Sequence, residues 1–464
     1  MVYEITPIKH KPYRGSSNRP PLRIGKGRIY NGAKFINPLP GVNALINHKE
    51  KTLFISVRPE RMEFEIARVF LYKALNSYEN RFSVFIKGIP FCFLPDACDH
   101  ILPPRPFPHK AVKLDICSRC RLHRLCPGLE PDSFFRGPAG KNLKPVLEIP
   151  LEIVIEVNRR CNLACAVCSS SSLTAELSLP QIRLHLRAAR TLGVKNIRFT
   201  GGEPFLHPRI LEALAAAKKL GFYVLVNTNA TLLNAKLIKK ASPFIDNILV
   251  SMQGCDAESE AVATGIRGLF PEKIKNIRLL RRSGIGVLRL GTIISKELIE
   301  NFERHQALAE NLKAEVWELY RPMSAKAWRQ KDFPTLKDLR RLAKHLEPRL
   351  ERKPRVVFAN PVPFCLFKKS QAPLFLGAIF DDGHSRLILD PRGFYKPSYY
   401  IQKNLGVSAR EAWDSRLLKD ISDPSRLGGK CRNCVFRLRC RGGSRFLAWT
   451  ENGNYIEKDP LLTP

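Results

Sequence analysis

The stretch from Leu151 to Cys168 reads LEIVIEVNRRCNLACAVC and determines how the middle of the chain folds. Its first seven residues, LEIVIEV, predict a β-strand. Cys161, Cys165 and Cys168 follow in the spacing CxxxCxxC, on the loop that leaves this strand. Three thiolates on one short loop can ligate three irons of a cubane iron–sulfur cluster and leave the fourth iron open to a ligand.

Beyond this stretch, β-rich runs alternate with helical patterns as far as about residue 320. The runs are NIRFT at 196–200, YVLVN at 223–227, NILVS at 247–251, GVLRLGTII at 286–294 and EVWELY at 315–320. Such alternation predicts parallel βαβ units with right-handed crossovers. Six units in about 170 residues are too few for a closed eight-fold barrel, so we expect a partial (β/α)6 barrel.

A polar or glycine-rich motif follows each of the next three strands. The motifs are Thr200-Gly201-Gly202-Glu203-Pro204, Asn227-Thr228-Asn229 and Ser251-Met252-Gln253-Gly254. The carboxyl ends of parallel strands share one edge, where β/α barrels assemble their active sites. Paired glycines let the backbone approach a ligand, and the Glu203 carboxylate can accept hydrogen bonds from an amino group. Turn or cap chemistry is the alternative explanation for Asn229 and Ser251, and a carboxylate at a helix N-terminus is the alternative for Glu203.

The ordered set of motifs, CxxxCxxC, GGEP, TNxTLL and SxxG, resembles the radical S-adenosylmethionine (SAM) superfamily over about residues 150–320. The resemblance implies a 4Fe-4S cluster on the three loop cysteines, with SAM chelating the unique iron. One-electron reduction then cleaves SAM to methionine and a 5′-deoxyadenosyl radical. By the same resemblance the cofactor-binding residues are Gly201, Gly202, Glu203, Pro204, Asn229 and Ser251. Val167 stands where the family usually has an aromatic residue.

The remaining cysteines, among 13 in total, are not scattered. Two sets share the spacing CxxCxxxxxC, one at 117, 120 and 126 and the other at 431, 434 and 440. Such spacings in a reduced compartment indicate metal or iron–sulfur ligation first. The N-terminal set offers four thiols, for which we expect an iron–sulfur cluster rather than zinc, although the two sets could share ligands: Cys92, Cys117, Cys120 and Cys126.

Residues 383–464 resemble the SPASM or twitch extension, which carries auxiliary iron–sulfur clusters in enzymes that act on peptides and proteins. Several cysteines of that extension are replaced here, by Ser398, by Ser444 and near Leu461-Leu462. A hydroxyl or an alkyl group does not replace a thiolate at an iron site. We therefore expect at most one C-terminal cluster, whose candidate ligands are Cys365, Cys431, Cys434 and Cys440.

Cys255 stands alone just beyond the fourth strand, on the predicted rim of the active site. A thiol there could donate a hydrogen atom or face the substrate, which makes Cys255 a candidate catalytic residue. A half-buried small residue without a catalytic role is the other interpretation.

The net charge of +35 indicates either an acidic partner such as RNA or a Lys- and Arg-rich solvated surface. No window approaches the ~20 apolar residues of a membrane span, and the first residues lack the apolar core of a secretory signal. We therefore expect a cytoplasmic protein without a membrane partner, whose thiols stay reduced.

Four regions are expected: a basic disordered tail at 1–33, an accessory cysteine-rich α+β region at 34–130, the core barrel at 150–325 and the SPASM/twitch-like domain at 355–464. We predict an α/β radical SAM enzyme that abstracts hydrogen from a peptide or protein and takes electrons from a donor such as ferredoxin or flavodoxin. The alternatives are a radical SAM enzyme that modifies RNA and a non-catalytic iron–sulfur protein for electron transfer or nucleic-acid binding.

Overall fold

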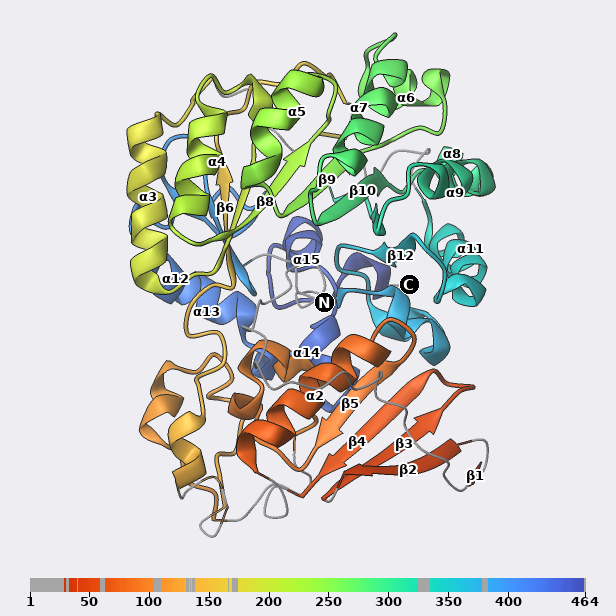
Figure 1. The fold of residues 1–464 in the computed structure, drawn as a ribbon. Coiled ribbons are helices and arrows are strands. Elements are labelled where there is room, and N and C mark those ends of the chain that lie inside the picture. Colours follow the sequence, from red (N-terminus) through yellow and green to blue (C-terminus); the bar gives the residue numbers. More distant parts are fainter. Residues whose placement is uncertain are drawn as a thin grey trace, which may run out of the picture. The chain divides into compact units, whose positions relative to one another are not determined.

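The computed structural model of the chain describes residues 29–30, 33–39, 41–58, 63–103, 110–130, 133, 135, 138–165, 167–168, 174–323, 334–377 and 383–462. The basic tail expected at 1–33 lies almost entirely outside these residues. The chain divides into two compact units (Figure 1). Unit 1 comprises Met1–Glu148, Phe367–Pro373 and Asp423–Arg441, and unit 2 comprises Ile149–Leu366, Leu374–Ser422 and Gly442–Pro464.

Unit 1 is built on a five-stranded sheet in the order β1-β2-β3-β4-β5. Its strands are β1 (Ile29–Tyr30), β2 (Ala33–Leu39), β3 (Val42–Asn47), β4 (Thr52–Val57) and β5 (Ser83–Lys87). The first four strands pair antiparallel, whereas β4 and β5 are parallel and are connected by helix α2 (Phe64–Tyr78). Unit 1 is therefore an α+β unit.

A segment from far along the chain completes unit 1. Helix α14 (Arg437–Cys440) contacts the 3-10 helix at Pro95–His100. The rings of Phe436 and Phe85 lie 5.3 Å apart, and an Arg124 nitrogen lies 3.5 Å from an Asp423 oxygen. The C-terminal cysteine set therefore folds together with the N-terminal cysteine-rich region.

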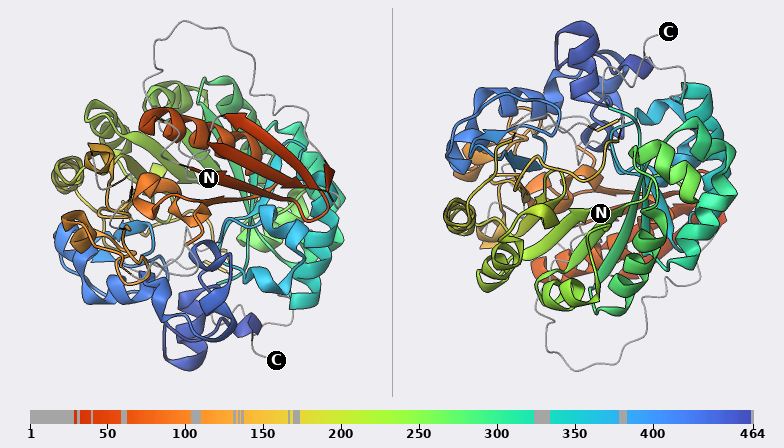
Figure 2. Two further views of the ribbon diagram at one scale, coloured as in Figure 1. Left: turned by 90° about the horizontal axis from the view of Figure 1, so that it is seen from below. Right: turned by 90° about the horizontal axis from the view of Figure 1, so that it is seen from above.

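Unit 2 contains a nine-stranded sheet in the order β12-β11-β10-β9-β8-β7-β6-β13-β14 (Figure 2). Its strands are β6 (Glu152–Glu156), β7 (Asn196–Thr200), β8 (Tyr223–Thr228), β9 (Asn247–Ser251), β10 (Val287–Ile293), β11 (Val316–Tyr320), β12 (Arg355–Phe358), β13 (Arg386–Leu389) and β14 (Tyr395–Lys396). Every pair from β12 to β13 is parallel, and only β14 is antiparallel to its neighbour. The six predicted strands are β6 to β11, and the sheet is open, which confirms the partial barrel.

Helices connect the parallel strands and cover the sheet in Figure 1. The connecting helices are α3 (Leu179–Leu192), α4 (Ile210–Lys219), α5 (Ala235–Ala241), α6 (Ala257–Thr264), α7 (Phe270–Arg282), α8 (Lys296–Glu300), α9 (Phe302–Asn311) and α11 (Leu336–Leu346). Three more helices of unit 2 follow the last strand: α12 (Ala409–Asp414), α13 (Arg416–Ser422) and α15 (Arg445–Asn452). α3 begins at a capping box between Ser178 and Gln181 and ends at Gly193, whose φ of 93° suits glycine. Local sequence therefore fixes where this crossover helix begins and ends.

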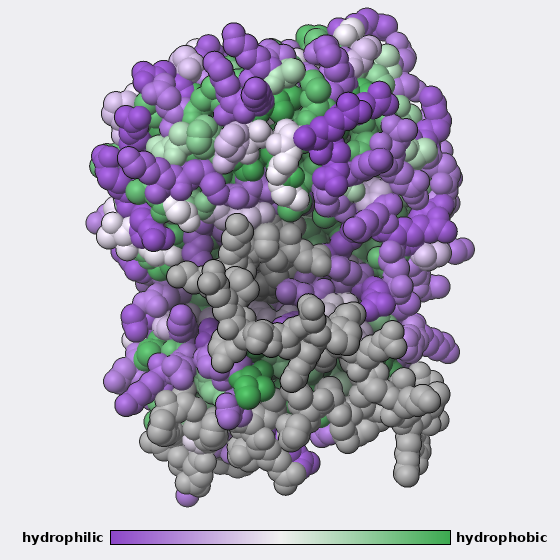
Figure 3. All heavy atoms as spheres, viewed as in Figure 1, coloured by the Kyte–Doolittle hydropathy of each residue, from purple (hydrophilic) through white to green (hydrophobic). Residues whose placement is uncertain are grey.

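The sequence contains 77 Lys and Arg residues against 42 Asp and Glu residues. Figure 3 shows hydrophilic side chains over much of the coloured part of the face that it draws. In the described ranges, no helix has the length and apolarity needed to cross a membrane.

Candidate active site

A cavity of about 300 Å³ lies at the carboxyl ends of the unit-2 strands. Val167 lines it from the cysteine loop, and Gly201 and Ser251 line it from the turns after β7 and β9. Beside apolar residues, the lining includes a group of charged and aromatic side chains on the strands and the segments after them: Arg198, Arg289, Glu318, Tyr320, Arg386 and Tyr399. The cavity therefore combines two predicted cofactor-binding residues with a charged inner wall that the motifs did not reveal.

The loop after β6 carries Cys161, Cys165 and Cys168 close to one another. Cys161 and Cys168 are exposed, whereas Cys165 is half-buried. Burial raises the pKa of the Cys165 thiol to about 11, and the neighbouring Cys168 and Cys161 contribute in the same direction. Burial also raises the pKa of Cys161. The N–H of Leu163 donates to the Cys161 sulfur at 3.4 Å and partly offsets this rise. A bound cation would favour deprotonation of these thiols.

The glycines of the GGEP turn bring it against the backbone that leads into the cysteine loop. A Cβ on Gly201, where φ is 153°, would lie 2.4 Å from the Asn158 oxygen, and a Cβ on Gly202 would lie 2.1 Å from the Arg160 oxygen. The Gly202 N–H donates to the Asn158 oxygen at 3.0 Å. The two glycines thus permit the close contact between the two loops. From the sequence, they were expected only to let the backbone approach a ligand.

Glu203 is 1% exposed and joins the turns after β7 and β8. Its carboxylate accepts hydrogen bonds from the Asn229 N–H at 2.7 Å and the Thr228 hydroxyl at 2.8 Å. It also accepts from the Phe205 N–H at 3.1 Å, where it caps the 3-10 turn that begins at Pro204. Burial raises the pKa of Glu203 to about 7, although these hydrogen bonds oppose the rise.

The side chain of Asn229 points toward the cysteine loop. Its Nδ2 donates to Asn162 Oδ1 at 2.9 Å and lies 3.8 Å from the sulfur of Cys161. Its Oδ1 accepts from the Thr231 hydroxyl at 2.7 Å. Asn229 thus holds the first cysteine in place, and neither Asn229 nor Glu203 is among the described residues that line the cavity.

A buried ion pair that sequence reasoning missed holds the turn after β9. Glu260 accepts from the N–H groups of Gln253 at 2.8 Å and Gly254 at 2.7 Å. Its other oxygen pairs with the Lys273 ammonium, which also donates to the Ser251 oxygen at 3.0 Å. A Cβ on Gly254 would lie 2.1 Å from the Glu260 nitrogen. The glycine of the SxxG motif was therefore the one sequence feature that could have indicated a close contact at this turn.

The spacing of the loop thiols suits a group larger than a single metal ion. Within the described part of the chain, only Cys255, Glu297 and His305 bring three ligand atoms of His, Cys, Asp or Glu within 4.8 Å of one another. Zinc, with thiolates at about 2.3 Å, holds its sulfurs about 3.8 Å apart. A thiol-only, more widely spaced donor set therefore fits a cubane iron–sulfur cluster better.

Cys255 is half-buried and lies beside Glu297 and His305 rather than in the cavity lining of the described residues. The His305 Nε2 atom lies 2.9 Å from a carboxylate oxygen of Glu297, within hydrogen-bond distance. Burial and the Glu297 carboxylate raise the pKa of the Cys255 thiol. A catalytic role for Cys255 stays a prediction.

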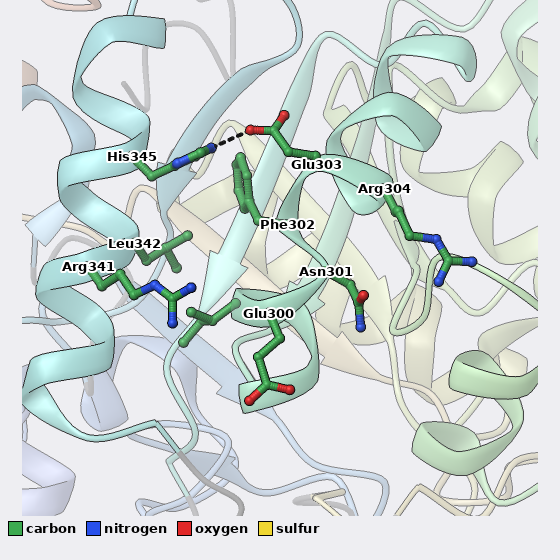
Figure 4. A pocket seen from close by; sticks show the side chains of 9 residues that line it. Glu300, Asn301, Phe302, Glu303, Arg304, Arg341, Leu342 and His345 are labelled. Carbon is green, nitrogen blue, oxygen red and sulfur yellow. Dashed lines mark hydrogen bonds and ion pairs between the residues drawn. The ribbon is translucent and has the colours of Figure 1, made fainter.

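A second cavity, of about 240 Å³, lies between α8, α9 and α11 (Figure 4). Glu303 and His345, joined by a hydrogen bond of 2.7 Å, stand on its rim. Its nine lining residues include no cysteine and none of the predicted site residues. The predicted chemistry therefore belongs to the cavity at the strand ends.

Unit 1 gathers the four thiols of the N-terminal set. Burial raises the pKa of Cys92 to about 12, and the raising effects of Cys126, Cys120 and Cys117 show that these thiols lie near it. Burial likewise raises the pKa values of Cys120 and Cys126. Four thiols gathered in one place form a donor set that can hold an iron–sulfur cluster or a zinc ion.

One local hydrogen bond recurs at cysteines of both units. The N–H two residues after the cysteine donates to its sulfur at Cys120, Cys126, Cys161 and Cys434. Such donors favour the thiolate form. Cys431, Cys434 and Cys440 belong to unit 1, whereas Cys365, the expected fourth ligand, is exposed and belongs to unit 2.

Ser398 and Ser444, at which the resemblance to the SPASM extension expected cysteines, both have hydrogen-bond partners. Ser398 accepts from the N–H groups of Tyr400 at 3.1 Å and Ile401 at 2.9 Å. Ser444 caps α15, and its N–H donates to Asp459 at 2.7 Å. Both serines thus have a structural role in turns and a helix cap.

Comparison with known proteins assigns the fold and the family. Residues 155–309 match the family model of the radical SAM superfamily, which leaves the SPASM-like resemblance of residues 383–464 a prediction. The structure is similar to Streptococcus suis SuiB, with a TM-score of 0.55, 19% identity and coverage of 68% of this chain and 78% of SuiB. It is also similar to anSMEcpe with bound AdoMet and Kp18Cys peptide, with a TM-score of 0.54, 15% identity and coverage of 66% and 94%.

Two curated relatives have the name AdoMet-dependent heme synthase. The protein from Oleidesulfovibrio alaskensis is 24% identical over 67% of this chain and 86% of its own length. The one from Methanosarcina barkeri is 24% identical over 67% of this chain and 95% of its own length. The family match falls on the strands and loops that carry Cys161, Cys165 and Cys168, and residues 155–309 therefore form the radical SAM domain of a radical SAM enzyme.

Proposed function

We propose that this enzyme abstracts a hydrogen atom from a peptide or protein substrate held in the cavity at the strand ends. The observation that carries the proposal is that the cysteine loop and the diglycine turn border the same cavity. The peptide substrate is supported by the SPASM-like C-terminal motifs. It is also supported by two proteins of similar fold whose structures contain peptides, SuiB with the precursor peptide SuiA and anSMEcpe with the Kp18Cys peptide.

The residues of the cysteine loop and of the neighbouring turns have different roles in this proposal. When bound, the 4Fe-4S cluster on Cys161, Cys165 and Cys168 supplies the electron that splits SAM into methionine and the 5′-deoxyadenosyl radical. Glu203 fixes the turns beside the loop, and Asn229 fixes the first cysteine through its amide. Ser251 and Gly201 line the cavity where the methionine part of SAM would lie.

Auxiliary clusters in unit 1 are the second part of the proposal. Cys92, Cys117, Cys120 and Cys126 would hold one iron–sulfur cluster, with no ligand position left open. Cys431, Cys434 and Cys440 offer three thiols for another. Electrons from a ferredoxin or flavodoxin would reach the catalytic cluster by way of such sites. Iron content falling by about four atoms in Cys120→Ser, with SAM cleavage retained, would support a separate cluster.

Hydrogen transfer tests the substrate class directly. Cells of the source organism grown in deuterated medium provide peptide, RNA and small-molecule fractions. The reconstituted enzyme is incubated with each fraction, SAM and dithionite, and the 5′-deoxyadenosine is weighed by mass spectrometry. A one-dalton increase with the peptide fraction, abolished by protease, is the expected result. Deuterium from the RNA fraction alone, abolished by ribonuclease, would contradict the peptide proposal.

A tetrapyrrole is a second candidate substrate. It is favoured by the name of the two curated relatives, each of which aligns with two thirds of this chain. Deuterium transfer from the small-molecule fraction, resistant to both enzymes, would favour it over a peptide.

A further inference from the structure

Four arginines line the cavity; Arg321 pairs with Asp459, and the other three stand on different strands and form its inner wall. Arg198 stands on β7, Arg289 on β10 and Arg386 on β13. The side chains of Arg198 and Arg289 are each 2% exposed, and that of Arg386 is 13% exposed. Burial of guanidinium groups is costly unless they are paired, so these arginines need negatively charged partners beside them.

Within the described residues, ion pairs connect these three cations to two carboxylates. Glu152 accepts from Arg198 at 2.9 and 3.0 Å and lies 3.1 Å from the Arg386 Nε. Glu318 lies 2.6 Å from Arg289 Nη1 and also accepts from the Tyr320 hydroxyl. The wall therefore carries an excess of positive charge before any ligand binds.

Two hydrogen-bond donors on this wall are buried without a partner among the residues that the structure describes. Arg289 is fixed by its bonds to Glu318 and, at 2.7 Å, to Asn247, yet its Nη2 has no acceptor. The Tyr399 hydroxyl has none either. Burial raises the pKa of Tyr399 to about 12, so the phenol stays protonated and can donate. Leaving buried donors unpaired is unfavourable, and an acceptor in the cavity would remove the penalty.

We propose that this wall binds a carboxylate of the substrate, with Arg289 Nη2 and the Tyr399 hydroxyl as its donors. The inference rests on the proposed function in that it names the chemical group by which the substrate is held in that same cavity. A guanidinium and a phenol together suit a planar carboxylate oxygen pair. The carboxylate could belong to an acidic peptide side chain or to a tetrapyrrole, since heme itself carries two.

Matched acid and neutral probes test the proposal on the reconstituted enzyme with SAM bound. The first pair is mesoporphyrin and its dimethyl ester, followed by fluorescence quenching. The second pair is a blocked peptide containing Glu and the same peptide containing Gln, followed by calorimetry. At least one acid form should bind about tenfold more tightly than its neutral partner, and the pair that does so identifies the source of the carboxylate.

The variants are Arg289→Gln and Tyr399→Phe, with Arg278→Gln as the control on the surface of α7. Tyr399→Phe removes a hydroxyl that has no protein partner, so the fold should persist even where Arg289→Gln unfolds. The preference for the acid form should fall to about threefold or less in both cavity variants and remain in the control.

Three results would overturn the proposal: equal binding of acid and neutral forms, a preference that survives in both cavity variants, or weakened binding of SAM alone. The last would assign the wall to the carboxylate of SAM. Release of 5′-deoxyadenosine is measured on the same samples, without any probe. Its absence alongside a preserved acid preference would contradict the radical chemistry and leave the carboxylate site standing.

Discussion

Replacement of Lys273 by Met should destabilise the protein and disorganise the turn after β9. Lys273 is 1% exposed, and its ammonium contacts both the Glu260 carboxylate and the Ser251 oxygen. Loss of the ammonium leaves the buried Glu260 with only the N–H groups of Gln253 and Gly254 as partners that the structure describes. Breaking a buried ion pair from one side costs about 3–5 kcal/mol.

Helix α7 offers a matched control two residues along. Lys275 pairs with Glu272 at 3.3 Å, but its side chain is 66% exposed, and such pairs contribute about 1 kcal/mol or less. Urea unfolding should therefore show a loss of about 3–5 kcal/mol for Lys273→Met and about 1 kcal/mol or less for Lys275→Met. Because Ser251 lines the cavity, Lys273→Met should also weaken SAM binding, by about tenfold in calorimetry if the turn moves.

The double variant Lys273→Met/Glu260→Gln separates lost charge from lost packing. It removes the stranded carboxylate, so it should recover part of the stability lost in Lys273→Met. Equal losses in Lys273→Met and Lys275→Met would refute the structural role assigned to the pair. So would unchanged SAM binding in a Lys273→Met protein that is clearly destabilised.

Two further substitutions test the ion pairs of Glu152 in the cavity wall and the diglycine turn at Gly201 and Gly202. Burial raises the pKa of Glu152, but Arg198 and Arg386 outweigh it and lower the pKa from 4.5 to about 2. The ionised carboxylate therefore contributes about 3 kcal/mol to the free energy of unfolding above about pH 4.5, and this contribution is lost as the pH falls toward about 2. Glu152→Gln should therefore lower the free energy of unfolding by about 3 kcal/mol at pH 7, and a difference from wild type that does not shrink on acidification would contradict this. Gly202→Ala should cost about 1–3 kcal/mol and reduce iron incorporation, because its Cβ would lie 2.1 Å from the Arg160 oxygen. As a control, Gly428→Ala should change neither the stability nor the iron content, because a Cβ at Gly428 would have open space around it. Equal iron content in Gly202→Ala and Gly428→Ala would contradict the importance of the contact between the diglycine turn and the cysteine loop.

The sequence predicted the barrel because its strands are short, apolar and regularly separated by helices. The strands β6 to β11 and the motifs after them appear where the alternation placed them. The charged wall was not predicted. In NIRFT, Ile197 and Phe199 alternate with polar residues, a pattern that usually indicates one face in solvent. Here helices cover the apolar face and Arg198 lines the cavity, so both faces are buried.

Two other features were hidden because they depend on residues distant in the chain. Glu260 lies in the first turn of α6, where a carboxylate is commonly explained by the helix dipole, and Lys273 resembles the exposed lysines around it. Only the fold brings them together. Likewise, the C-terminal cysteine set joins unit 1 through contacts of Phe436 and α14 that no local pattern encodes.

Radical generation by the cysteine loop is tested most directly by anaerobic reconstitution with iron and sulfide, followed by dithionite and SAM. The wild-type protein should release 5′-deoxyadenosine, and Cys165→Ala should release none while keeping iron on unit 1. A fully reconstituted wild type that binds only zinc at Cys161, Cys165 and Cys168, or that leaves SAM intact, would contradict the assignment.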